Sequence, residues 1–266
     1  MTIARLAAPL LLAAALLPAE SKILKLRTAE GLTLHNATAA PSKLQGKKAL
    51  KVTISEEAAA KMAAPPAPAE PKQGGQKKGA TKKAGQKKGG AAPATAPAAE
   101  ANRVDVLALV DSLDFSNGTI ELDLAGEPGP GASGGARGFV GLAFRVQPDR
   151  KTYDCFYLRP TNGRADDQER RNHTAQYIHH PDFPWFRLRQ ETPSRYESYV
   201  DILPAAWIHI KIEVDGDKGR LYVGKAKQPV LLVNDLKSGP SGKGAVALWL
   251  EGSTIAHFAN LKITPR

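Results

Sequence analysis

The sequence predicts an all-β protein built as an antiparallel β-sandwich. Three observations lead to this prediction. Short segments alternate apolar and polar residues with a period of two, and clusters of Gly, Pro, Asp and Ser separate those segments at short intervals. Runs with a helical period are nearly absent, and residues 56–62 form the one good helix candidate.

Residues 1–19 have the pattern of an export signal. Arg5 gives a basic start, an apolar run from Leu6 to Leu17 follows, and small residues lie within and after it. The run is shorter than the roughly 20 residues that span a bilayer. We therefore expect a secreted or periplasmic protein, exported by a bacterial-type signal, with no transmembrane segment after the signal is removed. A buried N-terminal helix is the alternative.

Residues 20–62 contain the first predicted strands, at 32–35 and 49–54. In the second strand Leu50, Val52 and Ile54 alternate with polar residues, which is typical of a half-buried strand. An isolated pair of strands is marginally stable at best. These strands are therefore expected to join the same sandwich as residues 102–266.

Residues 63–101 form a low-complexity segment of Ala, Pro, Gly, Lys and Gln. It holds seven lysines against two glutamates and has no apolar face to bury, so it is predicted to be a disordered insertion. The stretch from Lys72 to Lys88 is expected either to contact an anionic cell-surface polymer or to remain a solvated loop. Because much of the net charge of +11 lies here, we expect no specific nucleic-acid binding by the folded part.

Residues 102–266 are dense in predicted strands. The clearest is 207–214, where Ile208, Ile210, Ile212 and Val214 alternate with Trp207, His209, Lys211 and Glu213. Explicit turn signals, such as Asp-Gly-Asp-Lys-Gly at 215–219, separate the strands. The other predicted strands are 104–110, 118–124, 138–146, 154–159, 220–223, 230–233, 244–250 and 257–263.

Several segments in order resemble the concanavalin A-like lectin/glucanase superfamily. They are Phe-Ser-Asn-Gly-Thr-Ile-Glu-Leu-Asp-Leu at 115–124, Gly-Phe-Val-Gly-Leu-Ala-Phe-Arg at 138–145, Trp-Ile-His-Ile-Lys-Ile-Glu-Val-Asp at 207–215, Gly-Arg-Leu-Tyr-Val-Gly at 219–224 and Ala-Asn-Leu-Lys-Ile at 259–263. The likeness is greatest to its laminin-G-like and 3-keto-disaccharide-hydrolase-type exported bacterial domains. It implies a jelly-roll sandwich that handles carbohydrate. The paired-acid run Glu-x-Asp-x-x-Glu of the classical glucanases is absent, and Glu121-Leu122-Asp123 is the nearest fragment.

The segment 153–199 combines aromatic and polar residues in an unusual density. We interpret 185–191 as a strand, which would aim Trp185, Arg187 and Arg189 to one side because side chains alternate in a strand. An outward-facing wall of this kind suits a sugar, since aromatic rings cover its apolar face and Arg forks bind its hydroxyls. A ladder of cross-strand pairs that only stabilises the sheet is the alternative. The predicted ligand-binding residues are Arg145, Tyr157, Arg159, Gln176, Trp185, Arg187, Arg189 and Trp249.

Catalytic and metal-binding groups are less clearly marked. If the protein is an enzyme, Glu191 or His180 is the expected acid or base, with Glu197 and Asp201 as further candidates. No cofactor and no metal site are predicted: adjacent residues of a strand point to opposite faces, so His179 and His180 would not chelate one ion. Asp166 and Asp167 could offer oxygens to calcium, but calcium takes six or more ligands.

Three functions remain open from the sequence. The first is an exported module that binds carbohydrate on one sheet face. The second is a glycoside hydrolase or lyase of the 3-keto-disaccharide type. The third is an envelope adhesion or scaffold domain whose basic loop binds a polyanion.

Overall fold

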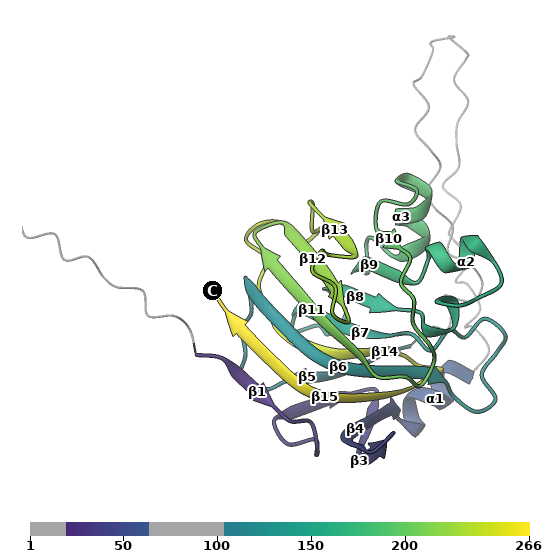
Figure 1. Ribbon diagram of the computed structural model, residues 1–266. Helices are drawn as coiled ribbons and strands as arrows, with labels where there is room; N and C mark the ends of the chain where they lie inside the picture. Colours follow the sequence, from purple (N-terminus) through teal and green to yellow (C-terminus); the bar gives the residue numbers. More distant parts are fainter. Residues whose placement is uncertain (1–19, 64–103) are drawn as a thin grey trace, which may run out of the picture.

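The computed structural model describes residues 20–63 and 104–266 (Figure 1). The predicted export signal lies outside the described residues. So does all of the predicted insertion except residue 63, including the stretch from Lys72 to Lys88. Both therefore stay predictions. Among the residues that the structure does describe, no helix is long and apolar enough to cross a lipid bilayer.

Two antiparallel sheets lie face to face, which confirms the predicted β-sandwich (Figure 1). The eight-stranded sheet has the order β13-β12-β11-β6-β15-β4-β3, with β1 also paired to β15. Its strands are β1 Lys22–Leu24, β3 Ala37–Leu44, β4 Lys47–Ile54, β6 Gly118–Pro128, β11 Ile208–Asp215, β12 Lys218–Val223, β13 Leu231–Val233 and β15 Thr254–Pro265. The seven-stranded sheet has the order β10-β9-β8-β7-β14-β5-β2. Its strands are β2 Leu32–His35, β5 Asp105–Val110, β7 Val140–Val146, β8 Tyr153–Leu158, β9 Ala175–His180, β10 Glu197–Ser198 and β14 Ala245–Glu251.

Strands that precede residues 64–103 pair with strands that follow them in both sheets. In the seven-stranded sheet β2 pairs with β5, and Leu34 lies opposite Ala108. In the eight-stranded sheet β4 pairs with β15, and Leu50 lies opposite Phe258. The first block of the chain therefore completes the same sandwich as the last.

The inner faces of the two sheets form the core. In β11 the side chains of Ile208, Ile210, Ile212 and Val214 are buried, as their alternation predicts. The sheets approach closely at Gly219 of β12, where an added Cβ would lie 3.0 Å from the ring of Phe156 in β8. Phe156 therefore points inward and the residues on either side of it in β8 point away from the core.

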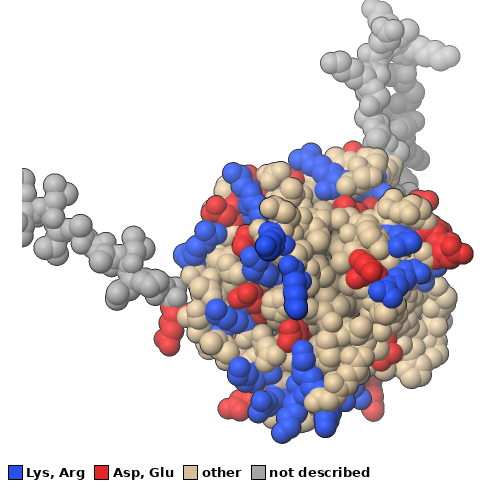
Figure 2. Space-filling model, viewed as in Figure 1, with Lys and Arg blue, Asp and Glu red and all other residues tan. Residues whose placement is uncertain are grey.

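The outer face of the eight-stranded sheet carries charges of both signs. Lys211 and Glu213 pair at 2.8 Å, and Lys47 and Asp123 at 3.0 Å. Figure 2 shows Lys and Arg interspersed with Asp and Glu over this face. Mixed charge of this kind keeps a sheet face in water without creating a field of one sign.

Three short helices lie at the ends and edges of the sandwich: α1 Glu56–Ala63, α2 Gln168–Asn172 and α3 Trp185–Glu191. The strand predicted for 185–191 is therefore wrong. Pro184 stands at the N-terminus of α3, and Arg187 Nε lies 2.7 Å from Glu191 Oε1, a pairing at i and i+4 that only a helix allows. Because a helix turns by about 100° per residue, Trp185 and Arg189 still share one side, with the Arg189 guanidinium 4.6 Å from the Trp185 ring, whereas Arg187 lies on another side.

Candidate functional site

One row of side chains crosses the outer face of the seven-stranded sheet. The strand registers place Glu197 opposite Gln176, Gln176 opposite Tyr157, Tyr157 opposite Gly141, and Gly141 opposite Trp249. Residues that face each other across paired strands point to the same side of a sheet. The sequence prediction that Tyr157, Gln176 and Trp249 share one face therefore agrees with the geometry.

Gly141 at the middle of this row lets two aromatic rings meet across the intervening strand. A Cβ at Gly141 would lie 2.6 Å from Tyr157 Cβ, so no side chain fits there. The rings of Tyr157 and Trp249 instead contact each other, with centroids 4.9 Å apart. This packing fixes both rings against the sheet.

The face is closed over and is not an open platform. Asp105 at the start of β5 accepts a hydrogen bond from Tyr153 Oη of β8, and Trp249 Nε1 donates to the same Tyr153 oxygen at 3.2 Å. His180 stacks on Tyr153 with ring centroids 5.3 Å apart. Tyr157 and Trp249 have no exposed surface, so the predicted open wall of sugar-stacking rings is wrong in this part of the sheet. Strand alternation predicts which face a side chain lies on, but it does not report whether that face is covered.

Arg159 follows β8 and connects the buried row to the rim of the sheet. Its guanidinium donates to Tyr157 Oη at 2.9 Å and to Gln176 Oε1 at 3.2 Å. It also donates to the carbonyl of His173 at 2.8 Å and lies 6.0 Å from the ring of Trp185. The structure therefore brings Arg159, Gln176 and Tyr157 together as predicted, with the Trp185 ring alongside.

Glu197 of β10 is a buried acid at this edge of the sheet. We call Glu197 and its basic neighbours Arg159, His173 and Arg189 the Glu197 cluster. Its carboxylate accepts hydrogen bonds from Arg189, with Nε at 3.1 Å, and lies 3.7 Å from Arg159 NH1. His173 Nδ1 lies 2.8 Å from Glu197 Oε2. A buried carboxylate is stable only when it is paired, and two guanidinium groups meet that need here.

A pocket of about 200 Å³ opens beside the Glu197 cluster. Tyr199 at its wall is 40% exposed, and Arg171 holds it by donating to the phenol oxygen at 2.9 Å. The walls thus combine one accessible aromatic ring with hydroxyl, amide, imidazole and carboxylate groups. The lining residues are Asn172, His173, Ser194, Glu197, Ser198 and Tyr199.

The imidazole of His173 is held neutral in this pocket. Burial is the largest cause and lowers the pKa of His173. The negative charge of Glu197 acts in the opposite direction, and the positive charges of Arg189 and Arg159 lower the pKa further. A neutral imidazole has one nitrogen that donates and one that accepts a hydrogen bond. His173 therefore presents both kinds of hydrogen-bonding group near neutral pH.

Arg145 does not belong to this face, although strand alternation predicts it there. Its backbone has a φ of +54°, and the pairing of β14 with β7 shifts register between Ala245 and Ala247. This β-bulge turns the side chain inward, where it is buried. There the guanidinium donates to the carbonyls of Ser116, Gly216 and Gly239 and to Ser238 Oγ.

Arg187, Glu191 and His180 lie away from the pocket. Arg187 pairs with exposed Glu191 along α3 and covers the ring of Phe183 at 4.2 Å. His180 Nδ1 lies 2.7 Å from the carbonyl of Lys151, at the β7–β8 hairpin. Neither of the two predicted catalytic groups, Glu191 and His180, therefore lines the pocket beside Glu197.

The described part of the chain gathers no three His, Cys, Asp or Glu side chains in a way that could hold a metal ion. Asp167 caps α2 by accepting from the backbone N–H of Arg170 at 3.0 Å, and Asp166 is exposed. His179 points into the core, with Nδ1 3.0 Å from Asp154. It is thus separated from His180, which lies on the outer face.

Sequence reasoning missed His173 and Tyr199 as partners in one site and gave Glu197 only a secondary place. His173 follows α2, Glu197 begins β10, and only the pairing of β10 with β9 brings them together. The run Glu197-Ser198-Tyr199 was a usable signal, because an acid, a hydroxyl and an aromatic residue lie side by side.

No family model matches the chain, and no curated protein matches it. Solved structures similar to it include a protein of unknown function with a galectin-like fold from Bacillus subtilis, at 12% identity, TM-score 0.46, and coverage of 92% of this chain and 96% of that one. Another is the carbohydrate-binding module CBM66 from Bacillus subtilis, at 19% identity, TM-score 0.41, and coverage of 61% and 82%. A third is the Bacillus licheniformis β-glucanase, at 14% identity, TM-score 0.35, and coverage of 61% and 71%. The likeness is one of fold. At these identities and scores the likeness says nothing of what the chain binds or does.

Proposed function

We propose that this protein binds carbohydrate in the pocket beside the Glu197 cluster. The observation that carries the proposal is the composition of the pocket: an accessible aromatic ring, Tyr199, next to a fixed carboxylate, Glu197, and a neutral imidazole, His173. A sugar presents an apolar C–H face and hydroxyls that both donate and accept. The Tyr199 ring can pack on the C–H face, and the polar walls can hydrogen-bond the hydroxyls.

The size of the pocket favours a single sugar unit. Typical small-molecule sites have roughly 300–1,000 Å³, whereas this pocket has about 200 Å³. The Glu197 carboxylate is held by Arg159 and Arg189 before any ligand arrives. Such preorganisation reduces the ordering cost of binding. We therefore place a terminal sugar residue in the pocket, with the rest of the glycan outside.

Replacing Tyr199 with alanine is expected to weaken glycan binding about tenfold or more, because the substitution removes the accessible ring from the pocket wall. A glycan array identifies the ligand, and titration calorimetry measures the affinity. Tyr222→Ala is the matched control, since Tyr222 lies on the other sheet and bonds Glu213 at 2.9 Å. Binding that survives Tyr199→Ala and fails in Tyr222→Ala would move the site to the eight-stranded sheet.

Glycoside cleavage is the second candidate, and the contact between His173 and Glu197 favours it. The Glu197 carboxylate and the neutral His173 imidazole, 2.8 Å apart, both line the pocket, and either group could accept a proton from a water or a sugar hydroxyl bound there. Glu197→Gln is expected to lower turnover of a chromogenic aryl glycoside by about a hundredfold or more. Glu191→Gln, in the exposed pair on α3, is the control and should retain activity. Full turnover in Glu197→Gln would remove the catalytic role.

A further inference from the structure

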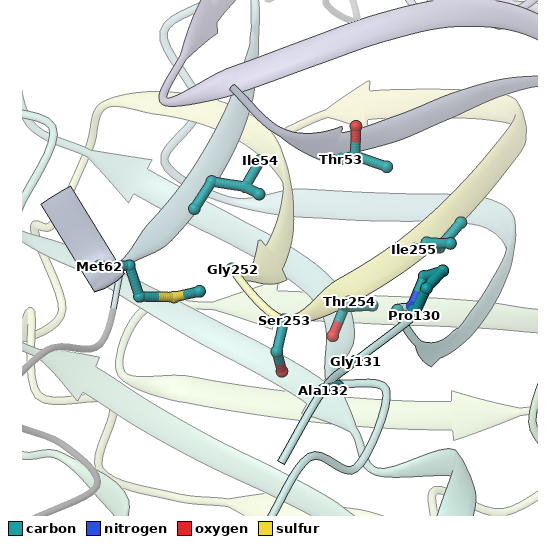
Figure 3. A pocket seen from close by; sticks show the side chains of 11 residues that line it. Thr53, Ile54, Met62, Pro130, Gly131, Ala132, Gly252, Ser253, Thr254 and Ile255 are labelled. Atoms are coloured by element: carbon teal, nitrogen blue, oxygen red, sulfur yellow. The ribbon is translucent and has the colours of Figure 1, made fainter. Parts of the chain in front are cut away.

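A second pocket, of about 360 Å³, shares no lining residue with the pocket beside the Glu197 cluster. Figure 3 shows its walls, which come from β4, α1, the loop after β6 and the turn between β14 and β15. Its volume lies within the range of small-molecule sites. The lining residues are Thr53, Ile54, Met62, Gly129, Pro130, Gly131, Ala132, Gly252, Ser253, Thr254 and Ile255.

The walls of this pocket are mainly apolar. Ile54, Met62, Pro130, Ala132 and Ile255 supply aliphatic groups and a thioether, and none of the described residues that line the pocket is charged. Burial of an apolar chain against such walls is favourable in proportion to the area removed from water. A thioether adapts readily to the shape of an apolar ligand.

One hydroxyl in the pocket has no partner. Thr254 is 2% exposed, and its Oγ1 makes no hydrogen bond. The neighbouring Ser253 hydroxyl, in contrast, donates to Glu251 Oε2. A buried polar atom without a partner is unusual in a native protein, because it forfeits the hydrogen bonds that water would give it. A ligand with one polar group would satisfy Thr254 Oγ1.

We propose that the pocket between α1 and the β14–β15 turn binds a small molecule with a short alkyl chain and one uncharged hydrogen-bonding end group. The chain lies against Met62, Ile54 and Ile255, and the end group bonds Thr254 Oγ1. The described walls offer an ionic ligand no charged partner, and a buried charge needs one, so an uncharged ligand fits them better. This site is separate from the carbohydrate pocket and does not depend on it.

The test uses 1-hexanol as the probe and the methionine methyl groups as the reporter. The chain has two methionines, Met1 and Met62, so a protein labelled with ¹³C-methyl methionine gives at most two signals, and Met62→Leu assigns them. We expect 1-hexanol to shift the Met62 signal saturably and to leave that of Met1 in place. Absence of a saturable shift of Met62 overturns the proposal.

Thr254→Val tests the hydrogen bond, since valine has the shape of threonine without the hydroxyl. It is expected to weaken 1-hexanol binding about fivefold to tenfold and to leave the affinity for 1-chlorohexane unchanged. Thr119→Val on β6, outside the pocket, is the matched control. Ala132→Phe fills the pocket and should abolish the Met62 response to both probes. Equal 1-hexanol affinities of the wild-type protein and Thr254→Val would contradict the assigned role of Thr254.

Discussion

Replacing Asp154 with alanine is expected to lower the free energy of unfolding by about 3–5 kcal/mol. Asp154 has no exposed surface and accepts hydrogen bonds from Tyr177 Oη at 2.6 Å and from Ser238 Oγ. His179 Nδ1 lies 3.0 Å from its Oδ1, and Arg145 NH1 lies 4.0 Å from its Oδ2. Removing the carboxylate leaves the buried Arg145 charge without its acid, which is the costly way to break an ion pair.

The protonation state of Tyr177 agrees with its role as a hydrogen-bond donor to Asp154. Burial raises the pKa of the Tyr177 phenol well above its usual value, and the charge of Asp154 raises it further, so the phenol stays protonated and donates. Urea unfolding followed by fluorescence measures the loss in Asp154→Ala. The control is Asp201→Ala, which breaks the exposed Arg164–Asp201 pair and should cost no more than about 1 kcal/mol. Similar losses in the two variants would show that the Asp154 network contributes little to stability.

Trp249→Ala is expected to destabilise the fold by about 3–5 kcal/mol through the cavity that it leaves. Trp249 has no exposed surface, its ring packs on Tyr157, and its Nε1 donates to Tyr153 Oη. The substitution therefore removes a large buried ring and leaves the Tyr153–Asp105 contact without one of its partners. Partial collapse of the outer face around Tyr157 should accompany the loss.

Thermal and urea unfolding measure this effect, and Trp207→Ala is the control. Trp207 is only partly buried, donates to the Leu44 carbonyl at 3.0 Å, and carries Lys47 over its ring at 4.5 Å. Trp207→Ala should therefore lower the free energy of unfolding by less than Trp249→Ala does. A stable Trp249→Ala variant that loses glycan binding would instead restore the sugar-stacking role that the sequence suggests for this ring.

The fold class was predictable because strand alternation reports burial on one side of a sheet. The alternation in 207–214 corresponds to β11, and the alternation of Leu50, Val52 and Ile54 lies in β4. The turn signals between these runs coincide with hairpins such as the one joining β11 and β12. These features are local, and so they can be read from neighbouring residues.

The site was predicted only in part, because its formation depends on contacts between distant segments. Tyr157, Gln176 and Trp249 share a face as predicted, yet all three are fully buried, and Trp249 contacts Tyr153, which bonds to Asp105, 48 residues away in sequence. The strand predicted at 185–191 overlooked Arg187 and Glu191, whose spacing of four is typical of a helix. The inward turn of Arg145 requires a bulge, and the residue pattern around it does not mark one.

Met62 and Val104, which flank residues 64–103 in the sequence, both lie against one glycine. Gly252 N donates to the Val104 carbonyl at 2.9 Å, and a Cβ on Gly252 would lie 3.0 Å from Met62 Sδ. Because Met62 and Val104 lie close together, a foreign domain with adjacent termini could be inserted between them without disturbing the pairing of β4 with β15 or of β5 with β14. The same geometry offers a route to reassembling the molecule from two co-expressed polypeptides, one carrying the first four strands and the other the remaining eleven.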